Sequence, residues 1–184
     1  MEALQKDQHY TYTDYASWED YPRCELIDGQ IHLMSAPSRV HQQILGELFV
    51  QLHVFLKGKT CQVYIAPFDV RLNYDTTDDT VVQPDILVVC DMTKLENGKT
   101  CMGAPDFVIE ILSPSTERHD AIRKLNLYLQ AGVKEYWLVD PEHKLVATHR
   151  LIDGQYVTAT YGEADEIPVM TLTGCTIKLS EVFS

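Results

Sequence analysis

The sequence predicts an α/β domain in which helices cover the faces of a mixed β-sheet. Two segments, 44–56 and 121–129, carry apolar residues at helical spacing. Short runs rich in valine and isoleucine lie between and after these segments, and such runs are typical of buried strands. The resulting order of helix, three strands, helix and strand favours a sheet with helices packed on it.

The N-terminal part is expected to add one short helix to this core. Thr13 is a suitable N-cap, acidic residues follow it, and Pro22 ends the segment, so we expect a helix over residues 13–20. Residues 1–12 are expected to form a tail without fixed structure. Residues 13–184 are expected to form a single domain, because a chain of 184 residues with 45% hydrophobic content can bury one sizeable core.

Two Asp-Gly dipeptides predict β-hairpins, because tight hairpin turns favour Asp, Asn or Gly at their central positions. Strand-like segments flank Asp28-Gly29 near the N-terminus and Asp153-Gly154 near the C-terminus. The paired strands are expected over 23–27 with 30–34, and over 144–151 with 155–161.

The core elements follow one another along the middle of the chain. The first long helix is expected to end near Lys57-Gly58 and the second at Ala131-Gly132, where glycine is a preferred C-terminal residue. The segment Ser113-Pro114-Ser115-Thr116 supplies the polar residues with which the second helix can begin. We expect the core strands over 61–72, 81–90, 107–112 and 135–140.

The cysteines and the apolar runs indicate a cytoplasmic protein. Five cysteines are scattered without a CxxC pair. Their odd number argues against a secreted disulfide framework, and their spacing argues against a zinc site. We therefore expect small, buried thiols. The apolar runs are shorter than the roughly 18 residues of a membrane helix, and the N-terminus has no signal-peptide pattern, so no membrane partner is expected.

The net charge of −12, from 27 acidic and 15 basic residues, is the opposite of what a nucleic-acid-binding protein usually carries. Binding depends on the local field at the contact face, however, and bound divalent cations reverse the sign of a carboxylate-rich cleft. The charge therefore disfavours a DNA-cutting enzyme without excluding one.

Two carboxylates lie inside two of the most apolar segments, Asp85 within residues 81–89 and Glu110 within residues 107–112. An ionised carboxylate in an apolar environment needs a partner, a hydrogen bond or a metal ion, so this pair indicates a site. Alternating side chains allow both residues to face one side of a sheet, near enough to share Mg²⁺ or Mn²⁺. Lys124 follows on the next helix.

Asp85, Glu110 and Lys124 belong to a larger set of residues along the chain. The set consists of Glu25-Leu26-Ile27-Asp28-Gly29, His41, Pro84-Asp85, residues 108–115, Asp120, Lys124, Tyr128 and residues 132–141. Together these residues resemble the Uma-type family of restriction-endonuclease-like proteins, within the PD-(D/E)xK nuclease superfamily. The resemblance extends from Thr13 onward and is most specific between Glu110 and Pro141.

The resemblance implies a restriction-endonuclease-like core of αβββαβ order with added β-hairpins, and a metal-dependent phosphodiesterase site. Asp85 and Glu110 would bind Mg²⁺ or Mn²⁺, with the backbone carbonyl of Ile111 as a third ligand. The lysine of the superfamily motif would stand two residues after Glu110, where this chain has Leu112. Lys124 is the natural substitute, and it would position or activate the attacking water and offset charge in the transition state.

Glu25 and His41 are further catalytic candidates. Glu25 could be another metal or water ligand from the hairpin, and His41 at a helix N-terminus could contact phosphate or orient Glu25. Each candidate also has a structural alternative. These are Asp85 opening a strand, Lys124 pairing with Asp120, His41 capping or packing, Glu25 exposed and facing Arg23 or a neighbouring strand, and Tyr128 and Trp137 as core aromatics.

Three functions remain open at this point. The leading hypothesis is a metal-dependent endonuclease acting on nucleic acid, with DNA as the expected substrate, and a homodimer is plausible by analogy with related nucleases. The second is a nuclease-fold protein that binds a partner without cutting, as Leu112 and the acidic charge would suit. The third is a metal-dependent hydrolase of small phosphorylated substrates.

Overall fold

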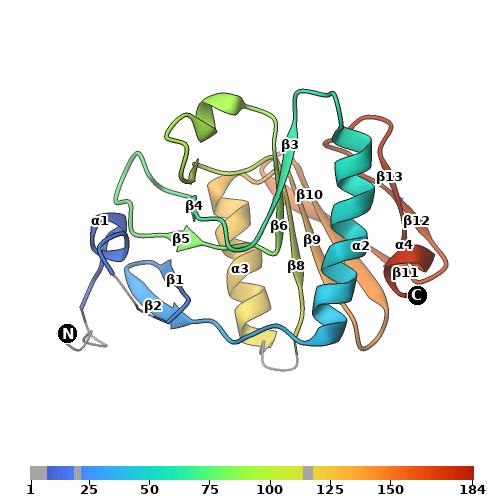
Figure 1. Cartoon of the computed structure of the whole chain (residues 1–184), viewed down its shortest axis with the longest axis horizontal. Coiled ribbons are helices and arrows are strands. Elements are labelled where there is room, and N and C mark those ends of the chain that lie inside the picture. The colour runs from blue at the N-terminus through green and yellow to red at the C-terminus, as the bar shows by residue number, and fades with distance from the viewer. Residues whose placement is uncertain (1–7, 19–21, 114–117) are drawn as a thin grey trace.

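A computed structural model of the chain describes residues 8–18, 22–113 and 118–184 (Figure 1). The helices are α1 Tyr12–Tyr15, α2 Arg39–Leu56, α3 Arg118–Ala131 and α4 Leu179–Val182, with a 3-10 turn η1 at Met92–Leu95. The strands are β1 Cys24–Ile27, β2 Gln30–Leu33, β3 Gln62–Ile65, β4 Val70–Arg71, β5 Val81–Val82, β6 Ile86–Val89, β7 Cys101–Met102, β8 Phe107–Ile111, β9 Glu135–Asp140, β10 Leu145–Ile152, β11 Gln155–Gly162, β12 Glu166–Pro168 and β13 Thr176–Lys178.

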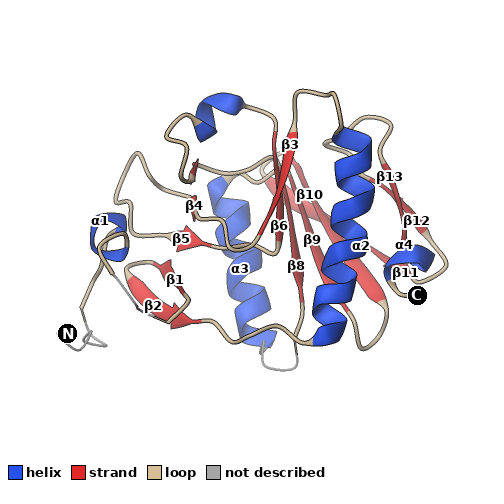
Figure 2. Ribbon diagram, in the orientation of Figure 1, coloured by secondary structure: helices blue, strands red, loops and turns tan. Residues whose placement is uncertain are grey.

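The central feature is a six-stranded sheet with the strand order β11-β10-β9-β8-β6-β3. It is mixed, because β8 and β9 run parallel whereas the other neighbouring strands run antiparallel. Figure 2 shows α2 and α3 on opposite sides of this sheet. The order α2, β3, β6, β8, α3, β9 matches the predicted helix, three strands, helix and strand, so the α/β prediction is confirmed.

Strands β6 and β8 are apolar along their length because both of their faces are covered. Ile86 belongs to a core cluster with Leu48 of α2, whereas the next residue, Leu87, belongs to a second cluster with Tyr128 of α3. Val108 of β8 lies in this second cluster. Because alternate side chains of a strand share a face, Glu110 also lies on the α3 side.

A second sheet, with the strand order β2-β1-β5-β4-β7, takes up the N-terminal hairpin and parts of two predicted core strands. The strands expected over 61–72 and 81–90 are each divided, and the two halves of each belong to different sheets. Pro67 and Pro84 lie in the breaks, and proline has no N–H with which to continue a hydrogen-bonded ladder. The prediction of two continuous strands was therefore wrong.

Both predicted hairpins are confirmed. Strands β1 and β2 pair around Asp28-Gly29, and β10 and β11 pair around Asp153-Gly154. The φ angles are +50° and +73° in the first turn and +49° and +79° in the second. Positive φ at both central positions is what this turn type requires, which explains the choice of Asp and Gly.

The first helix begins earlier than predicted. Its N-cap is Thr11 rather than Thr13, because the Asp14 carboxylate accepts a hydrogen bond from the Thr11 N–H at 2.8 Å. Residues 19–21, which include the end of the predicted helix, lie outside the described residues.

Residues 8–12, assigned to the N-terminal tail in the sequence prediction, contact the rest of the protein. Tyr10 is buried, and its N–H donates to the carbonyl of Gly29 at 2.9 Å. Residues 1–7 of that tail lie outside the described residues.

The ends of the two long helices can be compared with the residues predicted to start and stop them. Helix α2 starts before the predicted apolar segment, and the hydroxyl of its N-cap Ser38 accepts from the His41 N–H. Helix α3 ends at Ala131 and is followed by Gly132 with φ of +82°, as predicted. Most of its expected start signal falls in residues 114–117, outside the described residues. No helix in the described ranges is long and apolar enough to cross a membrane.

Two of the cysteines form a disulfide. Cys61 and Cys90 lie opposite one another just beyond the paired ends of β3 and β6, where their sulfur atoms are joined. The prediction of thiols was wrong for this pair, because an odd cysteine count does not show which cysteines meet across a sheet. The remaining cysteines are free and buried, as predicted: Cys24, Cys101 and Cys175.

Candidate active site

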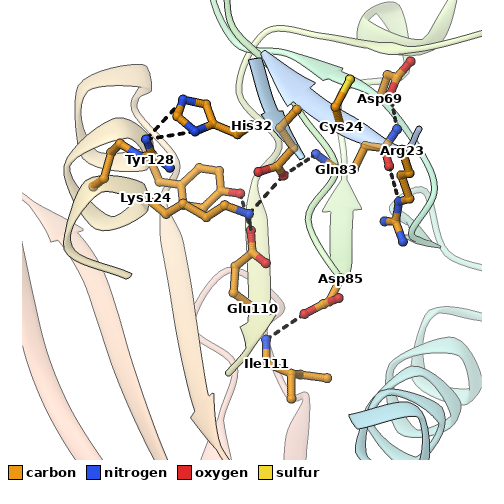
Figure 3. Close-up of polar contacts among 12 residues, drawn as sticks. Arg23, Cys24, His32, Asp69, Gln83, Asp85, Glu110, Ile111, Lys124 and Tyr128 are labelled. Atoms are coloured by element: carbon orange, nitrogen blue, oxygen red, sulfur yellow. Dashed lines mark hydrogen bonds and ion pairs between the residues drawn. The ribbon is translucent and has the colours of Figure 1, made fainter. Parts of the chain in front are cut away.

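A cavity of about 190 Å³ lies beside the end of β8, the start of β6 and the N-terminal part of α2. It is lined by all five side chains that the sequence analysis named as catalytic candidates: Glu25, His41, Asp85, Glu110 and Lys124. Most of their polar contacts are drawn in Figure 3. Residues from five separate parts of the chain therefore meet at one place.

Asp85 lies in the break between β5 and β6, and not within a strand as predicted. Its Oδ2 accepts a hydrogen bond from the backbone N–H of Ile111 at 2.8 Å (Figure 3). The same oxygen accepts from Nε2 of His41 at 3.1 Å. His41 thus orients Asp85, whereas the sequence analysis suggested that it orients Glu25.

The backbone of Ile111 faces a gap in the sheet. The register that pairs Ile86 with Ile109 places Pro84 opposite Ile111, and proline has no N–H. In an antiparallel ladder the N–H and the C=O of one residue face the same neighbouring strand. Because the Ile111 N–H points at Asp85, the Ile111 carbonyl faces the same side and has no ladder donor there.

The Glu110 carboxylate is held by helix α3 through a single oxygen. Its Oε1 accepts from Lys124 Nζ at 2.9 Å and from the Tyr128 hydroxyl at 2.6 Å, and these two donors are one helical turn apart (Figure 3). Lys124 therefore supplies an ammonium group beside Glu110, as a lysine in place of Leu112 on the same strand face would. The alternative pairing of Lys124 with Asp120 involves a side chain outside the described residues.

Glu25 of β1 completes the cluster from the second sheet. Its Oε1 accepts from Lys124 Nζ at 3.0 Å and from the backbone N–H of Gln83 at 2.9 Å. The Glu25 residue is only 4% exposed, so the alternative of an exposed strand residue facing Arg23 is wrong. Lys124 is a bridge between two carboxylates from different sheets.

The charges of the cluster shift one another's protonation. Burial raises the pKa of Glu110 to about 7, Lys124 opposes this rise, and the Asp85 and Glu25 carboxylates add to it. Burial lowers the pKa of Lys124, but the Glu110 and Glu25 carboxylates outweigh burial and raise it above its ordinary value. Lys124 is thus a cation at neutral pH, while Glu110 is near its midpoint and favoured as an anion by any added positive charge.

The donor atoms at this site fit a cation that prefers oxygen ligands. Hydrogen bonds from the described residues reach only Oε1 of Glu110 and Oδ2 of Asp85, which leaves Oε2 and Oδ1 without a protein donor. With the Ile111 carbonyl, these atoms form a set of hard oxygen ligands, and Mg²⁺ completes such sets with water. Since the described residues hold no group of three His, Cys, Asp or Glu side chains for a metal ion, that carbonyl and water would be needed.

Sequence reasoning missed two members of the site. Tyr128 is a buried aromatic with a satisfied hydroxyl, as predicted, but its acceptor is Glu110. The four-residue spacing from Lys124 was the available signal for this role. Gln83 had no such signal, because it contacts Glu25 through its backbone. The prediction for Trp137 is confirmed, since its Nε1 donates to Glu135 inside the core.

Comparison with known proteins connects this arrangement to one family. The family model described as "Uma2: Putative restriction endonuclease" matches residues 12–180. The "Uncharacterized protein slr1290" of Synechocystis sp. is 28% identical over 163 residues, which cover 86% of this chain and 84% of the relative. A crystal structure titled as a putative nuclease belonging to DUF820, from Anabaena variabilis, has a TM-score of 0.78 at 21% identity.

The structural alignment covers 95% of this chain and 97% of the Anabaena protein, and at this identity it shows a shared fold. The family match extends from α1 almost to the C-terminus and includes every residue of the candidate site. The resemblance seen in the sequence is thereby confirmed. The chain belongs to the Uma2 family, whose description is "Putative restriction endonuclease".

Proposed function

We propose that this protein is a metal-dependent endonuclease that hydrolyses phosphodiester bonds of nucleic acid, with DNA as its substrate. Family membership supports a nuclease. The observation that carries the proposal is the 2.9 Å contact between Lys124 Nζ and Glu110 Oε1. This contact restores beside Glu110 the ammonium group that the motif loses when Leu112 replaces its lysine.

Asp85, Glu110 and the Ile111 carbonyl would hold Mg²⁺ or Mn²⁺. Such an ion, when bound, polarises a phosphate and lowers the pKa of a coordinated water. Glu110 links the site to pH, because its pKa of about 7 means that protons compete for this carboxylate near neutrality.

Lys124 acts as a fixed positive charge and not as a base, since its pKa is raised above the ordinary value of lysine. A cation at this position offsets the negative charge that builds on the phosphate in the transition state. Glu25 and Tyr128 are positioning residues, because Glu25 holds Lys124 and Tyr128 holds Glu110. His41 has the same role for Asp85.

The experiment that tests this function compares metal binding and DNA cleavage in the same variants. Asp85→Ala and Glu110→Ala are expected to abolish cleavage of plasmid DNA with Mg²⁺ or Mn²⁺. Both are also expected to weaken Mn²⁺ binding in isothermal titration calorimetry, with an unchanged circular dichroism spectrum. The matched control is Glu166→Ala, which removes an exposed carboxylate from β12 and is expected to change neither measurement.

Cleavage that survives both Asp85→Ala and Glu110→Ala would contradict the proposal. A wild-type protein that hydrolyses no form of DNA or RNA with Mn²⁺ would favour a nuclease-fold binding protein. Turnover of a nucleotide or a model phosphodiester, without cleavage of plasmid or single-stranded DNA, would favour a hydrolase of small substrates.

A further inference from the structure

We propose that Arg23 is a substrate-binding residue whose guanidinium group binds a phosphate of the nucleic-acid strand that enters the cavity. The inference rests on the proposed function and names a contact that the PD-(D/E)xK motif does not contain. It follows from the way Arg23 is held, from the partners that its charged end lacks, and from the charge of the cavity.

Arg23 is an exposed residue just before β1, yet its side chain is anchored. Its Nε donates to Oε1 of Gln83 at 2.6 Å. The Gln83 residue is buried, and its amide nitrogen donates to Asp69 at 2.8 Å and to the Tyr15 hydroxyl at 3.1 Å. A buried amide with both ends hydrogen-bonded is a rigid support, so the guanidinium keeps one orientation with little further loss of entropy.

The anchoring bond uses only one edge of the guanidinium. Within the described parts of the chain, Nη1 and Nη2 of Arg23 have no hydrogen-bond or ion-pair partner, although both Arg23 and Asp85 line the cavity. Figure 3 shows the guanidinium on the Asp85 side of Gln83. The two Nη groups therefore present a pair of parallel donors, which is the geometry that matches two oxygens of one phosphate.

Lys124, the other lysine or arginine in the cavity lining, is already bound by carboxylates. Lys124 is bound by Glu25 and Glu110, and it cannot turn outward without leaving two carboxylates unpaired. Arg123 contacts the cavity lining through His32, because its Nη1 lies 3.1 Å and 3.2 Å from the two ring nitrogens of that residue. Arg23 is thus the cavity-lining cation, among the described residues, with donors to spare for a ligand.

The charge of the cavity requires such a donor. Glu25, Asp85 and Glu110 contribute three carboxylates against the single ammonium of Lys124. A phosphodiester anion entering this field is repelled unless further positive charge faces it, and the whole chain has a net charge of −12. An arginine at the rim gives this local attraction without weakening the Lys124 cluster.

Gln83 connects the two parts of the site. Its side chain anchors Arg23, while its backbone N–H donates to the Glu25 carboxylate that holds Lys124. Gln83, which positions the phosphate-binding guanidinium of Arg23, is therefore also in contact with the Glu25–Lys124–Glu110 cluster.

The test measures binding separately from cleavage. A fluorescein-labelled DNA duplex is titrated with protein in Ca²⁺ instead of Mg²⁺, and the anisotropy is recorded between about 50 and 200 mM salt. Arg23→Gln is expected to weaken binding by at least about tenfold at the lowest salt, as for loss of a charged hydrogen bond. It is also expected to reduce the slope of log K against log salt by about one, the signature of one lost phosphate contact.

Two further variants make the result specific. Arg23→Lys keeps the charge but loses the paired donors, so the salt slope should be retained while affinity falls by less than in Arg23→Gln. Lys57→Gln removes one positive charge from an exposed residue at the opposite end of α2 and should leave both quantities unchanged. The melting temperature of Lys57→Gln should match the wild type, because Lys57 is exposed. Both Arg23 variants lose the hydrogen bond to Gln83, so their melting temperatures should fall by only roughly 2 to 4 °C, as for about 1 kcal/mol.

The outcomes distinguish this inference from the proposed function. If the wild type cuts DNA and Arg23→Gln leaves the salt slope unchanged, the inference is overturned while the function stands. An effect of Arg23→Gln confined to particular base sequences, with an unchanged slope, would also overturn it, because the residue would then contact bases. If the wild type binds DNA without cutting and the slope falls by one, the contact holds and the nuclease proposal fails. A wild type that neither binds nor cuts overturns both.

Discussion

Glu110 on β8 and Glu135 on β9 are carboxylates on neighbouring core strands, and they differ in what surrounds their oxygens. The Glu110 side chain is 12% exposed. Glu135 is 0% exposed. Its Oε1 accepts from Trp137 Nε1 at 2.8 Å, and its Oε2 accepts from the N–H and the hydroxyl of Thr171 at 2.9 Å and 3.2 Å. In addition, Arg150 Nε lies 4.0 Å from Oε1 of Glu135. Both oxygens of Glu135 are thus saturated by the protein.

Glu110 is satisfied on one side only. Lys124 and Tyr128 both donate to Oε1, while Oε2 takes no hydrogen bond from the described residues, and the carboxylate lines the cavity. A carboxylate in an apolar strand is therefore not by itself a functional site. A saturated carboxylate ties loops to the core, whereas a carboxylate with an unused oxygen beside a cavity is able to bind a ligand.

The largest effect is expected from removing Lys124, the cation that is hydrogen-bonded to Glu110. Lys124→Met leaves Glu25 and Glu110 buried without their shared partner, so we expect a loss of about 3 to 5 kcal/mol of unfolding free energy. This corresponds to a melting temperature lower by roughly 10 °C for a chain of this size. Differential scanning fluorimetry provides the measurement.

Lys134→Met is the control for Lys124→Met. Lys134 also pairs with a carboxylate, at 2.6 Å from Asp106, but its side chain is 67% exposed. Its loss should cost less than about 1 kcal/mol. Equal losses of stability in the two variants would show that burial of the Lys124 cluster contributes nothing.

Direct comparison of Glu110→Gln with Glu135→Gln separates function from stability. Glu110→Gln should lower the rate of DNA cleavage on the order of 10² to 10³-fold, as for other preorganised charges at reacting centres. Glu135→Gln should retain cleavage but lose about 1 to 3 kcal/mol of stability, because its new NH₂ group faces the donors of Thr171. The measurements are plasmid nicking rates and urea unfolding. An equal loss of cleavage in both variants would show that Glu110 and Glu135 do not differ in function.

The raised pKa of Glu110 makes the stability of the protein depend on pH. Without metal, the folded state keeps a proton on Glu110 up to a pKa of about 7, whereas the unfolded chain releases it near the ordinary 4.5. Stability from this group is therefore complete below pH 4.5 and declines as the pH rises through 7, by at most about 3 kcal/mol. Urea midpoints of wild type and Glu110→Gln, measured across this range, should differ by an amount that changes with pH. A constant difference would contradict the raised pKa.

The smallest effect is expected from the neutral donors of the two carboxylates. Tyr128→Phe removes a hydrogen bond that favours ionised Glu110, so the acidic limb of the cleavage rate against pH should move to higher pH. The loss of stability should be about 1 kcal/mol. Trp137→Phe removes the matching donor of Glu135 and should leave the pH profile in place. A displaced profile in Trp137→Phe alone would reverse the roles given to the two sites.

Much of the candidate site could be predicted from the sequence because its residues are unusual for their surroundings. Placing the Glu110 carboxylate in an apolar strand between Ile109 and Ile111 costs free energy unless the carboxylate has a partner. The spacing of Lys124 and Tyr128 places both on one side of α3, which their shared contact with Glu110 confirms. The function and the metal ion that such a pattern favours stay predictions for the experiments above.

Other features could not be predicted, because they depend on where distant segments meet. Nothing near Glu25 in the chain indicates that it pairs with Lys124, a residue 99 positions later. His41 reaches Asp85 only because α2 begins beside the break that Pro84 introduces between β5 and β6. The disulfide between Cys61 and Cys90 likewise requires the register of β3 against β6.

Several local features of this protein follow from its amino-acid sequence: the two Asp-Gly turns, the apolar periodicity of α2 and α3, and a carboxylate on a core strand with a lysine on the next helix. These depend on residues that are neighbours along the chain or along one face of an element. Tertiary packing sets which carboxylate oxygens accept hydrogen bonds: both oxygens of Glu135 do, whereas Oε2 of Glu110 takes none from the described residues. Tertiary packing also brings Arg23 against Gln83 at the cavity. Such choices are made by packing between segments far apart in the sequence, where hydrogen bonds form only after the two sheets and α3 have come together.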